Sequence, residues 1–306
     1  MKQTNFGKRL GQTWRIVWQN RGAYMLLAPF MIIFFTFTVL PVIMSIVLSF
    51  FQYNILEEPV FVGFKNYRDL FVNDDEFAIA LRNTVVFALI TGPVGYILSF
   101  FAAWIINEFR PVVRAILTFI FYVPTISGTV YTIWGIIFSG DMYGYANSFL
   151  MKLGIIDNPI EWFTTDTYIL PLIIIVQLWM SMGSGFLVMR AGTASVDQQY
   201  YEAAAIDGVK NRFQEVFYIT IPMMAPHLMT AAVLQITGMF ANVGASIALA
   251  GFPSTNYAGH LIMTHLMDYS NYRVERGYAS AISVVLFVLM ISINSLAVKA
   301  LRKVGG

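Results

Sequence analysis

Hydrophobic residues run through most of the chain in long stretches that contain no Asp, Glu, Lys or Arg. Six such stretches occur: Gly22–Leu56, Asn83–Asn107, Ala115–Gly140, Thr167–Met189, Val216–Gly259 and Gly277–Val298. Each exceeds the ~20 residues that a helix needs to cross a ~30 Å hydrocarbon layer. The fifth, taken up to Gly259, has 44 residues, but its two ends are an amphipathic segment and a turn-rich segment. One crossing from about Ala225 to Ala250 fits it best, so the pattern predicts an all-α polytopic membrane protein with six transmembrane helices.

Composition supports the membrane assignment and excludes the sites that need cysteine. Of the 306 residues, 58% are hydrophobic and 12% are charged, whereas a soluble domain carries about 25% charged residues. The absence of cysteine excludes disulfides, thiolate metal sites and cysteine nucleophiles. The first apolar stretch is too long for a signal peptide, and Pro41 inside it predicts a kink or an early end.

The distribution of charge predicts the orientation. Thirteen of the 19 Lys and Arg residues lie in the N-terminal segment, the second and fourth connections and the C-terminal tail, and 12 of the 17 acids lie in the other connections. Because basic residues concentrate on the inside, both termini and the fourth connection are expected in the cytoplasm. The predicted organisation is a basic interfacial segment (1–21), a first transmembrane helix (22–50), an extracytoplasmic loop (51–82), a five-helix core (83–298) and a basic cytoplasmic tail (299–306).

The fourth connection, Ser195–Pro222, is the longest polar interruption in the second half of the chain. Ser195 and the glutamine three residues later form a capping-box pattern, which predicts the start of a short helix. Gly208 suits the left-handed residue that ends such a helix, and Asn211 can cap a second one. Pro222 is expected to break the chain before the next apolar run. The pattern therefore predicts a helix–turn–helix between two membrane spans, with an ordinary amphipathic loop as the alternative.

Polar and aromatic residues interrupt the third to fifth spans. Such groups in a membrane face other helices or a water-filled path, since an unpaired polar group in hydrocarbon is costly. Packing and substrate contact both remain open for each of them. The pathway-lining set predicted on this basis is Tyr131, Trp134, Gln177, Trp179, Gln235 and Asn242.

Two groups of residues on the predicted outside contain side chains of the kinds that bind metals. Asp74, Asp75 and Glu76 form an acidic cluster with no His or Cys near it in the sequence, so a solvated face is expected. His260 and His265 are five residues apart and do not share a helical face, so a histidine metal pair is not expected. No metal site is therefore predicted.

Motifs for other functions are missing from the sequence. No phosphate-binding G-x-x-x-x-G-K-[ST] motif occurs, and no catalytic triad or carboxylate pair stands out, so an enzyme is not predicted. A secondary transporter driven by ions would carry charged residues within its spans, and these six stretches have none. A membrane scaffold or receptor that docks a protein on the central loop remains an alternative.

The central loop resembles the cytoplasmic EAA motif of binding-protein-dependent ABC importer permeases. That motif has EAA, three residues, Gly, about nine residues and an I-x-L-P ending. The matching residues are Glu202, Ala203, Ala204, Gly208, Ile219 and Pro222. Two departures occur: Ile221 replaces the usual leucine, and ten residues instead of nine separate Gly208 from Ile219. The second departure affects the register of the second helix.

The resemblance covers most of the chain. The segments VGFKNYRDLF, LRNT and YVPTISGTVYTIWGIIF, followed by a G-x2-N sequence at 144–147, are similar to sugar-transporting permeases of the maltose and glycerol-phosphate type. Those permeases often end the fifth span in a GGP-like turn, where this chain has Gly251-Phe252-Pro253.

The resemblance implies a type I ABC importer permease fold in a bacterial cytoplasmic membrane. It also implies a second, similar permease, two cytoplasmic ATPase subunits that hold ATP and Mg, and an extracytoplasmic solute-binding protein. No cofactor in this chain and no nucleic-acid partner are expected. The implied cargo is a sugar, in particular an oligosaccharide, with a non-sugar solute such as glycerol phosphate as the alternative. The residues implied for ATPase coupling are Glu202, Ala203, Ala204, Asp207, Gly208, Phe213, Phe217, Ile219 and Pro222.

Overall fold

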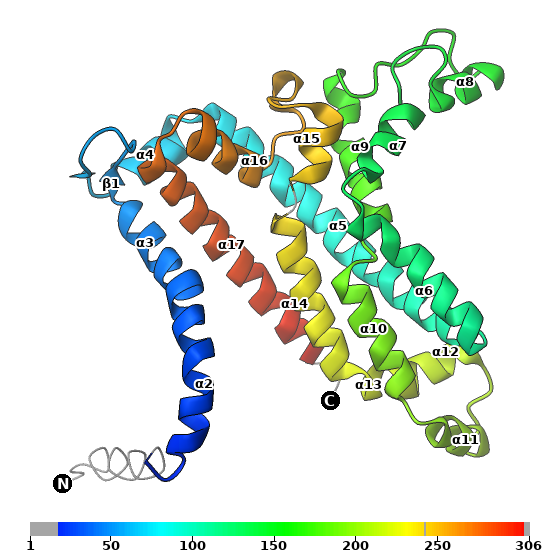
Figure 1. The fold of residues 1–306 in the computed structure, drawn as a ribbon. Coiled ribbons are helices and arrows are strands. Elements are labelled where there is room, and N and C mark those ends of the chain that lie inside the picture. Colours follow the sequence, from blue (N-terminus) through cyan, green and yellow to red (C-terminus); the bar gives the residue numbers. More distant parts are fainter. Residues whose placement is uncertain (1–17, 242, 303–306) are drawn as a thin grey trace.

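The computed structural model describes residues 18–241 and 243–302, which form a bundle of helices (Figure 1). The α-helices are α2 (Arg21–Phe34), α3 (Leu40–Leu48), α4 (Lys65–Val72), α5 (Asp75–Asn107), α6 (Pro111–Ile126), α7 (Val130–Ile137), α8 (Tyr145–Lys152), α9 (Asp166–Trp179), α10 (Ser184–Ser195), α11 (Gln198–Ile206), α12 (Arg212–Glu215), α13 (Ile221–Met223), α14 (Ala225–Ala241), α15 (Gly244–Ala250), α16 (Ile262–Met267) and α17 (Arg276–Arg302). Shorter turns are the π-helical η1 (Phe35–Val39), η2 (Val216–Thr220) and η4 (Asp268–Tyr272) and the 3₁₀ turn η3 (Thr255–Tyr257). A small antiparallel hairpin joins β1 (Phe51–Gln52) to β2 (Val60–Phe61).

Five helical segments of the described chain are long and apolar enough to cross a membrane. They are Arg21–Leu48, Asp75–Asn107, Asp166–Ser195, Ala225–Ala250 and Arg276–Arg302. The expected sixth span is present only if α6 and α7 are taken together, because they meet at an angle of 85°. The predicted third span, Ala115–Gly140, is therefore a bent pair of helices. Pro124 removes a backbone donor near the end of α6, and Ser127 has an extended backbone that ends the helix.

The first span stays helical through Pro41, so it does not end early at this proline. The π-turn η1 lies directly before this proline. In a π-turn the backbone bonds span one more residue than in an α-helix, so the turn accommodates the local disruption and the helix continues to Leu48. No residue of α2 is buried, and α2 stands apart from the other helices in Figure 1. The α3 end contacts α17, where the Ser45 and Ser283 hydroxyls lie 2.7 Å apart.

The core of the bundle is formed by α5, α10 and α14, which pack closely. Buried apolar residues fill the space between them, including Phe100, Phe186 and Met224. Small residues permit the close approach, as in many membrane helix pairs. A Cβ atom on Gly185 of α10 would lie 2.5 Å from Gln235 Cγ of α14. These two helices can therefore pack at this separation only because residue 185 lacks a side chain.

Different short helices lie at the two ends of the bundle. In Figure 1, α11 and α12 lie at the same end as the start of α2 and the end of α17, while α4, α8, α15 and α16 lie at the other end. At that other end α5 begins at Asp75, within the predicted loop 51–82. Asp74 caps the helix there by accepting a 2.8 Å hydrogen bond from the Phe77 N–H, which local sequence composition did not predict.

Candidate functional site

The 195–222 segment folds as the predicted helix–turn–helix. The first helix, α11, ends before Gly208, whose φ of +94° lies in the left-handed region that glycine adopts readily. Asn211 caps α12 by accepting a 2.9 Å hydrogen bond from the Gln214 N–H. The predicted cap at Ser195 is wrong, because this serine ends α10 and Asp197 caps α11. The Asp197 side chain accepts a 3.1 Å bond from the Gln199 N–H.

A π-turn replaces the expected break at the end of the loop. The helix continues from α12 through η2 into α13, and Pro222 lies in the first turn of α13. The extra residue noted between Gly208 and Ile219 coincides with η2. Because a π-turn accommodates one more residue than an α-turn, the residues on either side keep a common helical direction. The prediction that Pro222 interrupts the chain is therefore wrong.

The loop is attached to the bundle by buried and hydrogen-bonded side chains. Val216 and Ile219 are buried, and the Tyr201 and Thr220 hydroxyls, 3.0 Å apart, connect α11 to η2. An ion pair of 3.2 Å joins Arg212 of α12 to Glu108 at the end of α5. These contacts join the loop to the end of α5.

The other face of the loop is exposed and largely apolar. The Phe217 side chain is 63% exposed, although it follows the buried Val216 directly in the chain. Exposed large apolar residues that lie together mark interaction surfaces. The other exposed large apolar residues of the loop are Tyr200, Ile206, Phe213 and Tyr218. Of these, Phe213 lies beside Trp104 of α5, with ring centroids 6.1 Å apart. Of the sequence-predicted residues, Glu202, Ala203, Asp207 and Gly208 are also exposed, Ala204 is half-buried and Ile219 is buried.

A polar cavity of about 310 Å³ lies between α5, α9, α10 and α14. Three residues of the predicted pathway set line it, namely Tyr131, Gln177 and Gln235. The Gln235 amide donates to Ser99 Oγ at 2.8 Å and to the Ser181 carbonyl at 3.3 Å. Its Oε1 atom is enclosed without a partner among the described residues. The cavity therefore offers hydroxyl, amide and aromatic groups together.

Two other members of that set, Trp134 and Trp179, lie elsewhere and do not line the cavity. Their rings pack edge to face with centroids 5.3 Å apart, and Trp134 stacks on Phe138 at 5.9 Å. Asn242 lies outside the described residues. The structure thus brings half of the predicted set together.

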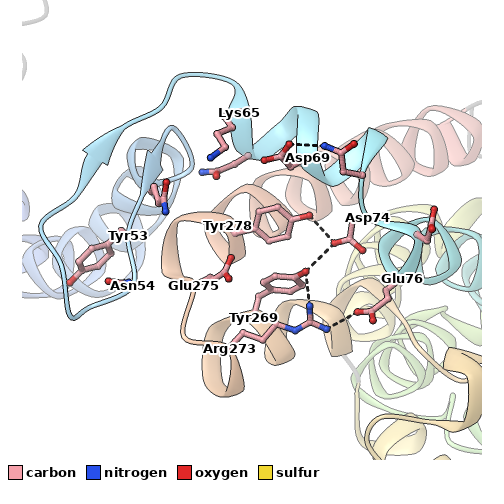
Figure 2. Close-up of a pocket in the computed structure, with 14 residues that line it drawn as sticks. Tyr53, Asn54, Lys65, Asp69, Asp74, Glu76, Tyr269, Arg273, Glu275 and Tyr278 are labelled. Carbon is pink, nitrogen blue, oxygen red and sulfur yellow. Dashed lines mark hydrogen bonds and ion pairs between the residues drawn. The ribbon is translucent and has the colours of Figure 1, made fainter.

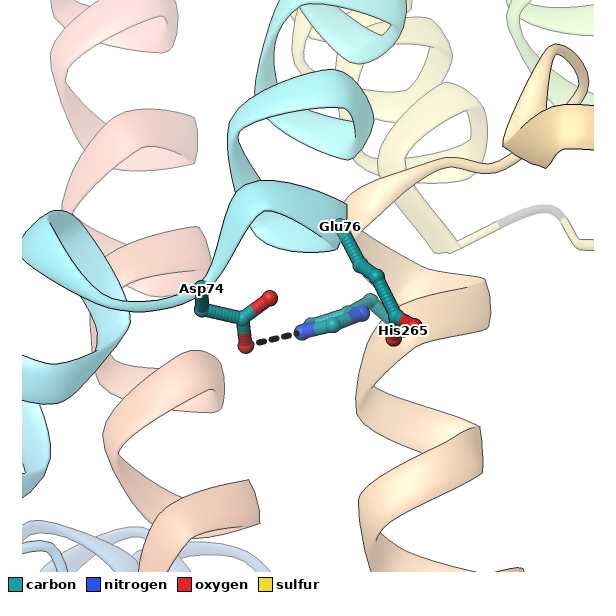
Figure 3. A group of neighbouring side chains, drawn as sticks. All are labelled: Asp74, Glu76 and His265. Atoms are coloured by element: carbon teal, nitrogen blue, oxygen red, sulfur yellow. Dashed lines mark hydrogen bonds and ion pairs between the residues drawn. The ribbon is translucent and has the colours of Figure 1, made fainter.

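The acidic cluster at the other end of the bundle is a partly buried network, not the solvated face expected from the sequence. Asp74 Oδ2 accepts hydrogen bonds from His265 Nε2 at 3.0 Å and from the Tyr278 hydroxyl at 2.7 Å (Figures 2 and 3). Burial by itself raises the pKa of Asp74, but the bonds from His265, Phe77 and Tyr278 outweigh it and hold the pKa at about 2. His260 Nε2 lies 3.3 Å from His265 Nδ1, and burial lowers the pKa of His260 to about 4.

Asp74, Glu76 and His265 have ligand atoms within 4.8 Å of one another, as a metal site requires (Figure 3). Other protein groups already engage all three residues. Glu76 accepts a hydrogen bond from Arg273 at 2.7 Å, and His265 is paired with Asp74. The Arg273 guanidinium supplies the positive charge that a metal would bring, so the group acts as an internal ion-pair network. It borders an outer pocket of about 600 Å³ (Figure 2). No local spacing indicates this network, since its members come from α5, α16, η4 and α17.

The family profile described as "Binding-protein-dependent transport system inner membrane component" matches residues 80–304. The chain belongs to this family. It is 30% identical over 275 residues to the probable ABC transporter permease protein YesP of Bacillus subtilis, covering 89% of this chain and 87% of that protein. It is 29% identical to the arabinooligosaccharides transport system permease protein AraP of the same organism, over 94% and 91% of the two chains. Identity to the trehalose/maltose transport system permease protein MalF of Thermococcus litoralis is 28%, over 91% and 93%.

A solved structure has the same fold. The permease superposes on a chain of a bacterial ABC transporter involved in the import of the acidic polysaccharide alginate, with a TM-score of 0.73 and 23% identity. The match covers 96% of this chain and 100% of the other. A second structure of the alginate transporter, in complex with alginate pentasaccharide-bound periplasmic protein, gives a TM-score of 0.75 at 23% identity, over 95% and 98%. The predicted ABC importer permease fold is confirmed.

Proposed function

We propose that this permease forms half of the translocation path of an ATP-driven oligosaccharide importer and that its α11–α12 loop docks on a cytoplasmic ATPase subunit. The observation that carries the proposal is the exposed apolar face of this loop. Phe217 and its neighbours are left in solvent on one side, while the other side is held by buried residues and by the Tyr201–Thr220 contact. An apolar face that the chain itself leaves uncovered, on a rigid support, fits a protein partner.

The mechanism follows from the attachment of the loop. ATP and Mg bind to the two ATPase subunits, whose closure moves the docked loop as a rigid body. The Arg212–Glu108 ion pair transmits that movement to α5, and the helix through η2 and α13 transmits it toward α14. These two helices border the 310 Å³ cavity, so movement of the loop changes access to the cavity.

A sugar cargo is supported by the cavity and by the relatives. Hydroxyl and amide groups suit the edges of a sugar, and an aromatic ring suits its apolar face. The side chains of Gln177 and Gln235 line the cavity, and an amide can bond a sugar hydroxyl. The names of the relatives refer to arabinooligosaccharides, trehalose and maltose. A second permease completes the path, and an extracytoplasmic binding protein delivers the sugar.

Substitution of Gly208 tests the coupling. Proline cannot adopt the φ of +94° at this position, so Gly208→Pro should misplace α11 relative to α12. Gly154, with a φ of +68° in the loop after α8, provides the matched control. Gly208→Pro and the charge reversal Glu202→Lys should both abolish ATPase co-purification and oligosaccharide uptake in cells, whereas Gly154→Pro should leave co-purification intact. If both loop variants kept the ATPase bound and uptake normal, the coupling role would be refuted.

The same uptake assay tests the cargo. Labelled oligosaccharides, monosaccharides and glycerol phosphate should be compared in cells that express the complete transporter. Uptake of glycerol phosphate in preference to every oligosaccharide would show that the sugar assignment is wrong while leaving the coupling role intact.

A further inference from the structure

A groove of about 380 Å³ lies between α3 and α17, at the end of the bundle that carries α4 and α16 (Figure 1). On α17 it is lined by Arg276, Ala279, Ser280 and Ser283. Residues three and four apart are neighbours on a helix surface, so these four share one face of α17. On α3 the groove is lined by Ser45, whose hydroxyl meets that of Ser283 at 2.7 Å. The charged and hydroxyl groups therefore face the same groove.

Arg276 gives this groove a positive charge that the described part of the chain does not neutralise. No carboxylate lines the groove, and the nearby ion pairs join Arg273 to Glu76 and Asp268. Arg276 is half-buried, makes no hydrogen bond or ion pair with a described residue, and has no enclosed nitrogen. Its complete fork of donors is thus available. Arg276 also lies in the first turn of α17, where a cation is unfavourable, so an anion is favoured here.

Hydroxyl groups follow Arg276 along the groove. The Ser280 hydroxyl has no partner among the described residues and is not enclosed, so it can donate a hydrogen bond to a ligand. Ser283 donates to the Ser280 carbonyl at 2.9 Å and lies about 10 Å from Arg276 along the helix axis. Because Arg276 begins a membrane-spanning segment, the polar part of the groove runs from the membrane boundary inward.

Apolar side chains complete the groove and continue it toward the middle of the span. Leu48, Ile55 and Leu266 line the groove together with the polar groups. The same face of α17 continues with Phe287 and Ile291, which are 39% and 47% exposed. From the boundary inward, this face therefore carries a cation, hydroxyl groups and then exposed apolar side chains. A phospholipid has its phosphate, glycerol esters and acyl chains in the same order, whereas a soluble anion would make no use of the apolar part.

We propose that the groove between α3 and α17 binds an anionic phospholipid, with its phosphate on Arg276 and its acyl chains along the exposed face of α17. Arginine forks bind phosphate oxygens well. An anionic head group is favoured over a zwitterionic one because no carboxylate lines the groove to receive an ammonium group. The site does not depend on the proposed transport function. A bound lipid would hold α3 against α17, which matters because α2 has no buried residue of its own.

Native mass spectrometry tests the site on the full-length permease, purified in a neutral detergent with the subunits that accompany it. Titration with dioleoylphosphatidylglycerol should show binding that Arg276→Gln weakens by roughly tenfold or more, because charged hydrogen bonds are lost. Ser280→Ala removes a neutral hydrogen bond and should weaken binding by about threefold. Arg276→Lys keeps the charge without the fork and should give an affinity between those of the wild type and Arg276→Gln. Dioleoylphosphatidylcholine should bind more weakly than phosphatidylglycerol.

The matched control is Arg82→Gln. Arg82 is an exposed arginine on the membrane-spanning α5 and does not line the groove, so this variant should bind phosphatidylglycerol as the wild type does. Equal weakening by Arg82→Gln and Arg276→Gln would indicate general attraction to boundary charge and would overturn the proposal. Unchanged binding by Arg276→Gln, or equal binding of the two lipids, would do the same.

Two competing occupants are separated by the same measurement. Displacement of the lipid by inorganic phosphate at similar concentrations would identify a soluble anion as the ligand. Binding by the isolated permease but not by its complex would show that a partner subunit covers the groove. Either result would overturn the proposal. Thermal unfolding establishes that each variant folds, and if Arg276→Gln does not fold, Ser280→Ala decides the outcome.

Discussion

Truncation of Phe217 to alanine should weaken ATPase binding strongly without affecting the fold of the permease. The Phe217 side chain is 63% exposed, and a phenylalanine offers about 200 Å² in total. Docking can therefore bury about 125 Å² of this ring, which at ~25 cal/mol per Å² corresponds to about 3 kcal/mol. We expect a loss of affinity of roughly a hundredfold. Because the ring is already in solvent in the isolated chain, thermal unfolding should change by less than about 1 kcal/mol.

The measurement is the dissociation constant between the detergent-purified permease and its ATPase subunit, by biolayer interferometry. Phe149→Ala is the matched control, because the Phe149 side chain is 62% exposed and lies on α8 at the opposite end of the bundle (Figure 1). The reasoning fails if Phe217→Ala binds as the wild type does, or if both variants lose affinity equally.

Two further predictions concern packing and pH. Gly185→Ala places a Cβ atom 2.5 Å from Gln235 Cγ, so it should destabilise the permease by about 1–3 kcal/mol and reduce uptake. Gly135→Ala, which meets nothing within 4 Å and lies outside the cavity, should do neither. The pKa of Asp74 is about 2 in the folded chain, below its ordinary value of 3.8. The ionised Asp74 therefore stabilises the fold above pH ~4. As the pH falls toward ~2, the free energy of unfolding should decrease by about 2 kcal/mol. Thermal unfolding across this range should show the loss in the wild type and not in Asp74→Asn; parallel curves would contradict the assignment.

Local sequence signals predicted the helix–turn–helix correctly because its determinants are local. Gly208 supplies a left-handed residue and Asn211 supplies a cap, and both act within a few residues along the chain. The extra residue before Ile219 was visible in the spacing, but its accommodation as the π-turn η2 was not. A π-turn forms when flanking helices are both held in place by packing, and sequence spacing alone does not contain that information.

The outer network shows the opposite case. Asp74 and His265 are 191 residues apart in sequence and 3.0 Å apart in space. In the sequence, Asp74 belongs to an acidic cluster with no histidine nearby, so the pattern predicted a solvated face. Packing of α16 against α5 and α17 buries it, and His265 and Tyr278 supply donors that lower its pKa. The predicted pathway residues show the same limit. Three of them line one cavity, namely Tyr131, Gln177 and Gln235, whereas Trp134 and Trp179 pack on each other. Their polar or aromatic character alone did not distinguish the two groups.

The sequence by itself determined the membrane spans, the polar loop between two of them and the family. Burial of an apolar helix in lipid depends on length and hydropathy, and caps and turns depend on neighbouring residues. Only the tertiary structure decided that the third span bends by 85° and that Asp74 is paired with His265. Such contacts join distant parts of the chain and depend on which faces of the helices pack together.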